Sequence, residues 1–244
     1  MVVTTTGLAF WVSSVGLAFC GICFFKAFKN MGGVNSGYKT GILLSTYYLA
    51  TAFQHFLLAL AGTFFVKNAN LFFTIIFLNH FVLSLIAALG VYLVFYVIFP
   101  NISPWSSICV VLIMGFVLII LTSTGYSSPL VTSIYSIDWN FSKSVSTLLL
   151  YIALIAIGSP LLVFLKNFSS SRSNSVKRIS LILSALQLLG VVNVIHLFGG
   201  YIYSFESVNY LFESLLAITG IIFLSIFLIV PLFRHRFNSR KKIA

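Results

Sequence analysis

Seven long apolar runs are the feature of this sequence that most limits its fold. Each run is at least as long as the roughly 20 residues that an α-helix needs to cross the ~30 Å hydrocarbon layer of a bilayer. Transmembrane β-strands would be about 10 residues long and would alternate in polarity. The runs therefore predict seven transmembrane helices, which we place at residues 7–28, 41–66, 71–99, 105–124, 145–165, 179–203 and 210–233.

The composition supports the same class of protein. Of the 244 residues, 60% are hydrophobic and only 7% are charged, whereas about a quarter of the residues of a soluble domain are charged. Seven spans and their short connections account for nearly the whole chain. We therefore expect an all-α integral membrane bundle that forms a single domain over residues 1–244, in the cell membrane, with no catalytic residue to name.

The positive charges predict the orientation of the bundle. In an alternating seven-span arrangement, all 14 basic residues except Lys67 and Lys143 fall on one side of the membrane. The positive-inside rule makes that side cytoplasmic, so the N-terminus is expected outside and the C-terminus in the cytoplasm. The net charge of +11 then needs no nucleic acid, because cytoplasmic loops are attracted to anionic lipid head groups.

A few polar side chains interrupt the apolar runs. Buried polar groups cost free energy unless they have partners, and inside a membrane they usually face the bundle interior or a wet cavity. At ~1.5 Å of rise per residue, the histidines of the runs and their polar neighbours lie in the outer half of the bundle or near its midplane. They predict a polar ligand pocket formed by the second, third, sixth and seventh runs and lined by Gln54, His55, Asn79, His80, Asn193, His196 and Glu213.

The spacing of these residues suggests how they would pair. Asn193 and His196 are three apart and are expected on one helix face, whereas the neighbours Asn79 and His80 point about 100° apart. We expect the partners of Asn79 and His80 to be Gln54 or His55 on the second helix and Asn193 or His196 on the sixth.

Three roles are open for the pocket. The polar groups could hydrogen-bond between helices and hold the bundle together. Alternatively, His55, His80 and His196, with or without Glu213, could bind zinc or copper, or two of the histidines could hold a haem. The third role is to bind a small organic ligand or a lipid, or to relay a proton. No His-x-x-x-His spacing on one helix favours the metal.

The sequence excludes one familiar function and ranks the others. The run 210–233 has no Lys to form a retinal Schiff base, so retinal is not expected as a cofactor. The first hypothesis is a membrane sensor or receptor that presents its basic face to a cytoplasmic or membrane protein partner. The second is a metal- or haem-binding redox protein or an accessory subunit of a membrane enzyme complex, and the third is a small-solute transporter.

Overall fold

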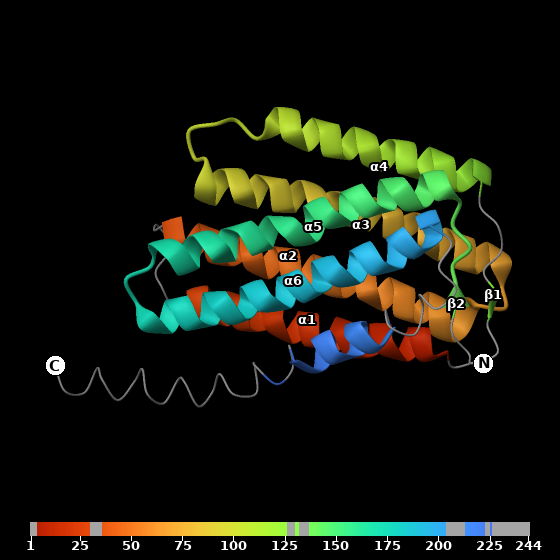
Figure 1. The fold of residues 1–244 in the computed structure, drawn as a ribbon, viewed down its shortest axis with the longest axis horizontal. Helices are drawn as coiled ribbons and strands as arrows, with labels where there is room; N and C mark the ends of the chain where they lie inside the picture. Colours follow the sequence, from red (N-terminus) through yellow and green to blue (C-terminus); the bar gives the residue numbers. More distant parts are fainter. Residues whose placement is uncertain are drawn as a thin grey trace.

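The computed structural model describes residues 4–29, 36–125, 130–131, 137–203, 213–222 and 225. Within these ranges six long helices lie side by side (Figure 1): α1 (Thr5–Lys29), α2 (Ser36–Leu60), α3 (Ala69–Ile98), α4 (Trp105–Gly125), α5 (Lys143–Ser170) and α6 (Asn174–Tyr203). A π-helical turn, η1 (Ala61–Phe65), extends α2, and a short apolar helix covers Glu213–Ile222. The strands β1 (Leu130–Val131) and β2 (Ile137–Asp138) form an antiparallel pair.

The six long helices coincide with the first six predicted spans. All six are long and apolar enough to cross a membrane, which makes the fold consistent with a multi-pass membrane helical bundle. The predicted seventh span, 210–233, is described only at residues 213–222 and 225. Its remaining residues lie outside the described ranges.

The helices pack as a series of neighbours. Proceeding along it, α1 contacts α2, α2 contacts α3, α3 contacts α5, and α5 contacts α6. Helix α4 lies at one edge of the bundle, against α3 and α5 (Figure 1). Large apolar side chains on α4 remain uncovered, with Trp105, Ile113 and Phe116 each more than 60% exposed. An apolar outer surface of this kind is suited to lipid and not to water.

The two ends of the bundle differ in charge. We call the end of the bundle where α1, α3 and α5 end and α2, α4 and α6 begin the basic end. Its neighbourhood carries Lys26, Lys29, Lys39, Lys166, Arg172, Lys177 and Arg178. The opposite end holds β1 and β2 and is called the strand end (Figure 1). Only Lys67 and Lys143 are basic there, among the described residues.

The start of α1 lies unusually close to η1. A Cβ added to Gly7 would come within 3.0 Å of the Gly62 carbonyl carbon, so only glycine allows this backbone-to-backbone contact. The Thr4 hydroxyl donates a hydrogen bond of 2.6 Å to the Gly62 carbonyl oxygen. This hydrogen bond ties the start of α1 to the π-helical turn.

Candidate functional site

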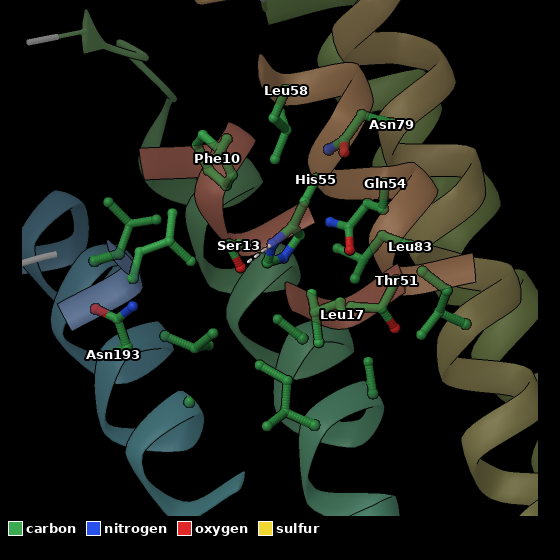
Figure 2. Close-up of a pocket in the computed structure, with 18 of the residues that line it drawn as sticks. Phe10, Ser13, Leu17, Thr51, Gln54, His55, Leu58, Asn79, Leu83 and Asn193 are labelled. Carbon is green, nitrogen blue, oxygen red and sulfur yellow. Dashed lines mark hydrogen bonds between the residues drawn. The ribbon is translucent and has the colours of Figure 1, made fainter. Parts of the chain in front are cut away.

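A cavity of about 160 Å³ lies between the helices (Figure 2). Its lining comes from α1, α2, α3, α5, α6, the loop after β2, and the 213–222 helix. Of the seven residues predicted to form a pocket, five line it: Gln54, His55, Asn79, His80 and Asn193. The polar lining also includes Ser13, Thr51, Gln187, Thr219 and the two tyrosines Tyr47 and Tyr48, none of which was predicted.

The two histidines of the cavity have partners other than those expected. Nδ1 of His55 and the Ser13 hydroxyl on α1 share a hydrogen bond of 2.7 Å (Figure 2). Nδ1 of His80 lies 3.1 Å from the Thr122 hydroxyl on α4. The expectation that His80 pairs with α2 or α6 is therefore wrong. Both partners are small hydroxyl residues on helices that the prediction did not include.

The hydrogen bonds of Thr122 determine the tautomer of His80. The Thr122 hydroxyl donates its only hydrogen to the Leu118 carbonyl at 2.8 Å. It must therefore accept from the His80 ring, and Nδ1 of His80 carries the hydrogen. In the neutral imidazole the other nitrogen, Nε2, is then an acceptor.

Two amides of the cavity have unused hydrogen-bonding capacity. Asn79 on α3 and Asn193 on α6 are 5% and 4% exposed. Within the described part of the chain, Oδ1 of each is buried without a hydrogen-bond partner. Figure 2 shows Asn193 across the cavity from Gln54 and Asn79. Since a buried polar group without a partner costs about 1–3 kcal/mol, these two positions stand out from a bundle whose other polar groups are mostly satisfied.

His196 and Glu213 are not part of the cavity lining. His196 follows Asn193 by three residues, nearly one helical turn, and its Nε2 is buried without a partner among the described residues. The two side chains therefore do not share a site, although their spacing suggested one face. No group of three His, Cys, Asp or Glu in the described ranges could hold a metal ion. The structure thus does not assemble the metal set of His55, His80 and His196.

Glu213 instead joins three segments at the strand end. Its carboxylate accepts hydrogen bonds from the hydroxyls of Thr5, at 2.7 Å, and Thr6. The Thr6 hydroxyl in turn accepts from the Ile137 N–H at 2.9 Å. The carboxylate lies at the N-terminus of α1, where the helix dipole favours a negative charge. Glu213 therefore ties the 213–222 helix to α1 and, through Thr6, to β2.

The 213–222 helix packs closely on α1. A Cβ added to Gly220 would lie 2.8 Å from the Cα of Ser13, which leaves no room for any other residue. From this position Leu216 and Thr219 line the cavity. The helix is thus a wall of the cavity, fixed to α1 at Glu213 and at Gly220.

Aromatic rings cover the strand end of the cavity, and a short local motif positions two of them. The Asp138 side chain accepts the Asn140 N–H at 2.9 Å, and Asn140 adopts a left-handed backbone conformation with φ of 51°. Asn adopts the left-handed conformation more readily than most residues, and Asp often accepts a hydrogen bond from the backbone two residues later. The turn places Trp139 and Phe141 in a stack with ring centroids 6.3 Å apart, and both line the cavity.

A proline interrupts the backbone hydrogen bonds of α5 beside the cavity. Pro160 in α5 has no N–H to donate to the carbonyl of Ala156, four residues earlier. The Tyr47 hydroxyl of α2 donates to that carbonyl at 2.9 Å instead. This contact joins α2 to α5 beside the cavity and explains why a tyrosine only 2% exposed is tolerated in the core.

Comparisons with protein-family models, curated proteins and solved structures find no match for this chain.

Proposed function

We propose that this protein is a seven-helix sensor or receptor of the cell membrane that binds a small ligand in the central cavity. The N-terminus would lie outside and the C-terminus in the cytoplasm. The charge of the described ends supports this orientation, because the basic end carries seven basic residues against two at the strand end. The apolar run 210–233 and the five basic residues after residue 233 support a seventh span that ends on the cytoplasmic side, near anionic lipid.

The observation that carries the proposal is the pair of buried amide oxygens that have no hydrogen-bond partner in the described part of the chain. Polar residues that only hold helices together hydrogen-bond to each other across the interface, as Tyr48 and Gln187 do at 2.8 Å. Asn79 and Asn193 both line the cavity, and their Oδ1 atoms have no such bond in the described ranges. A ligand in the cavity would supply the missing hydrogen bonds, which is how a specific site usually fixes its ligand.

The 213–222 helix supports a receptor in particular. It touches the cavity through Leu216 and Thr219, and it precedes the basic C-terminal sequence in the chain. A ligand that contacts these side chains would shift the population of positions of this helix. The basic cytoplasmic face would then pass that change to a protein partner.

Ligand binding can be tested by quenching of Trp139 fluorescence. Replacing Trp11 and Trp105 by Phe leaves Trp139, which lines the cavity, as the only tryptophan of the chain's three. This variant, in lipid nanodiscs, is titrated with ring-sized bromobenzene derivatives. We expect saturable quenching that is lost in Ala153→Leu, which fills the cavity, and retained in Ala69→Leu, an exposed control. Absence of saturable quenching by every probe would refute the ligand site.

Movement of the 213–222 helix is tested with an environment-sensitive fluorophore. The three native cysteines are first replaced by alanine. The label is then placed at Ile218→Cys, a position 47% exposed on that helix, and in a second variant at Ile113→Cys on α4, which is 62% exposed. Binding of a quenching probe should change the emission at position 218 and leave position 113 unchanged. Equal emission with and without bound probe at position 218 would contradict the receptor role.

A further inference from the structure

We infer that the cavity selects an uncharged, ring-sized molecule that carries an amide or a similar group able both to donate and to accept hydrogen bonds. This inference rests on the proposed ligand site and adds the chemical class of its ligand. It follows from the size of the cavity, the charge of its lining, its aromatic wall and its unpaired amides.

The size of the cavity limits the ligand to about one ring. Its volume is about 160 Å³. An engineered protein cavity of about 150 Å³ accepts benzene, so a single substituted ring fills a space of this size. The ring of such a ligand would find aromatic neighbours in Phe10, Trp139 and Phe141, which line the strand end of the cavity. Aromatic pairs add a favourable contact beyond the area that they bury.

The lining excludes a charged ligand. Among the described residues that form it there is no Asp, Glu, Lys or Arg, and its only ionisable groups besides tyrosines are His55 and His80. Glu213, the nearest acid along the 213–222 helix, is occupied by Thr5 and Thr6 outside the cavity. An ion moved from water into such a site would lose its hydration without gaining a counter-charge, and this cost is large.

The hydrogen-bonding groups select a polar substituent on the ring. Asn79 and Asn193 each present an amide, which has both donor and acceptor atoms, and their Oδ1 atoms have no partner in the described ranges. The tautomer set by Thr122 leaves Nε2 of His80 as an acceptor. A site with buried hydrogen-bonding groups discriminates strongly against analogues that cannot pair with them. A primary amide on the ligand matches an asparagine amide with two hydrogen bonds.

Four probes of nearly equal size separate these requirements. They are 4-bromobenzamide, which is neutral and polar, 4-bromotoluene, which is neutral and apolar, 4-bromobenzoate, an anion, and 4-bromobenzamidine, a cation. Each is titrated against the protein with Trp139 as its only tryptophan, in nanodiscs. We expect 4-bromobenzamide to bind about ten-fold or more tightly than 4-bromotoluene, the ratio that one good hydrogen bond provides. Neither ion should produce saturable quenching.

Variants of the two amides assign the selectivity to them. Asn79→Leu and Asn193→Leu should each lower the affinity for 4-bromobenzamide towards that for 4-bromotoluene. The control Asn70→Leu, at an exposed position of the same helix as Asn79, should leave the affinity for 4-bromobenzamide unchanged. Unaltered binding of 4-bromotoluene by the variants shows that their cavity is intact.

The outcomes distinguish the two proposals. If 4-bromotoluene or an ion binds at least as tightly as 4-bromobenzamide, or if both Leu variants retain full preference for the amide, the ligand class is wrong while the ligand site stands. If none of the four probes gives saturable quenching that Ala153→Leu removes, the ligand site itself is refuted.

Discussion

Replacing Tyr47 by Phe should show how much the stability of α5 around Pro160 depends on a hydrogen bond from α2. The Tyr47 hydroxyl donates at 2.9 Å to the Ala156 carbonyl, which Pro160 cannot reach with a hydrogen. Without the hydroxyl, that carbonyl is buried with no partner, at a cost of about 1–3 kcal/mol in the free energy of unfolding. The control Tyr151→Phe removes a hydroxyl from a side chain that is 54% exposed on α5, and it should cost almost nothing.

A second substitution tests the reason for this cost. In Pro160→Ala, the backbone N–H of residue 160 becomes available to the Ala156 carbonyl. Tyr47→Phe in that background removes only an ordinary hydrogen bond between helices, which averages about 0.6 kcal/mol in a membrane protein. The two changes should therefore be coupled by about 0.5–2 kcal/mol. Helix content followed by circular dichroism during unfolding in mixed micelles gives the four stabilities. An equal cost of Tyr47→Phe in both backgrounds would refute the explanation.

Three further outcomes follow from the structure. Gly220→Ala should weaken binding of 4-bromobenzamide, because its Cβ would meet the α1 backbone at 2.8 Å, whereas Gly37→Ala, with nothing within 4 Å, should not. Asn140→Val should lower the free energy of unfolding by about 1–2 kcal/mol through its positive φ, and Asn140→Gly should be tolerated. In cells expressing a variant with its three cysteines replaced by alanine, a membrane-impermeant maleimide should label Asn70→Cys from outside, and Ser173→Cys only after permeabilisation. The reverse labelling pattern would overturn the proposed orientation.

The sequence was sufficient to predict the six long helices of the described ranges, because length and apolarity leave a bilayer helix little choice. The six described long helices differ from the predicted runs by a few residues at their ends. The π-helical turn at Ala61–Phe65 was not predicted, since its sequence AGTFF also suits a regular helix. The turn at Asp138–Asn140 was not predicted either, because it lies in a connection between two spans, where the pattern of apolar runs carries no information.

The cavity was predictable only in part. Polar residues are rare in these runs, and this scarcity alone was enough to predict five of the residues that line the cavity. Their partners were not predictable, because Ser13 and Thr122 are small hydroxyl residues of a kind common in membrane helices. The rotation of each helix about its own axis is decided by packing, which the sequence does not display. The rotation of α6 places Asn193 in the cavity lining and leaves out His196, three residues later.

Helix α4 is the shortest of the six long helices in the described ranges. Its 21 residues span about 31 Å, whereas the 30 residues of α3 span about 45 Å. In a thicker bilayer, the hydrocarbon layer would therefore exceed the length of α4 before that of α3. The bundle would relieve this mismatch by a shift of α4 or by local thinning of the bilayer. Because α4 holds Nδ1 of His80 through Thr122, such a shift would reorient a side chain of the cavity. Under the proposed function, the physical state of the surrounding lipid would then act on the cavity as a second input besides the proposed ligand.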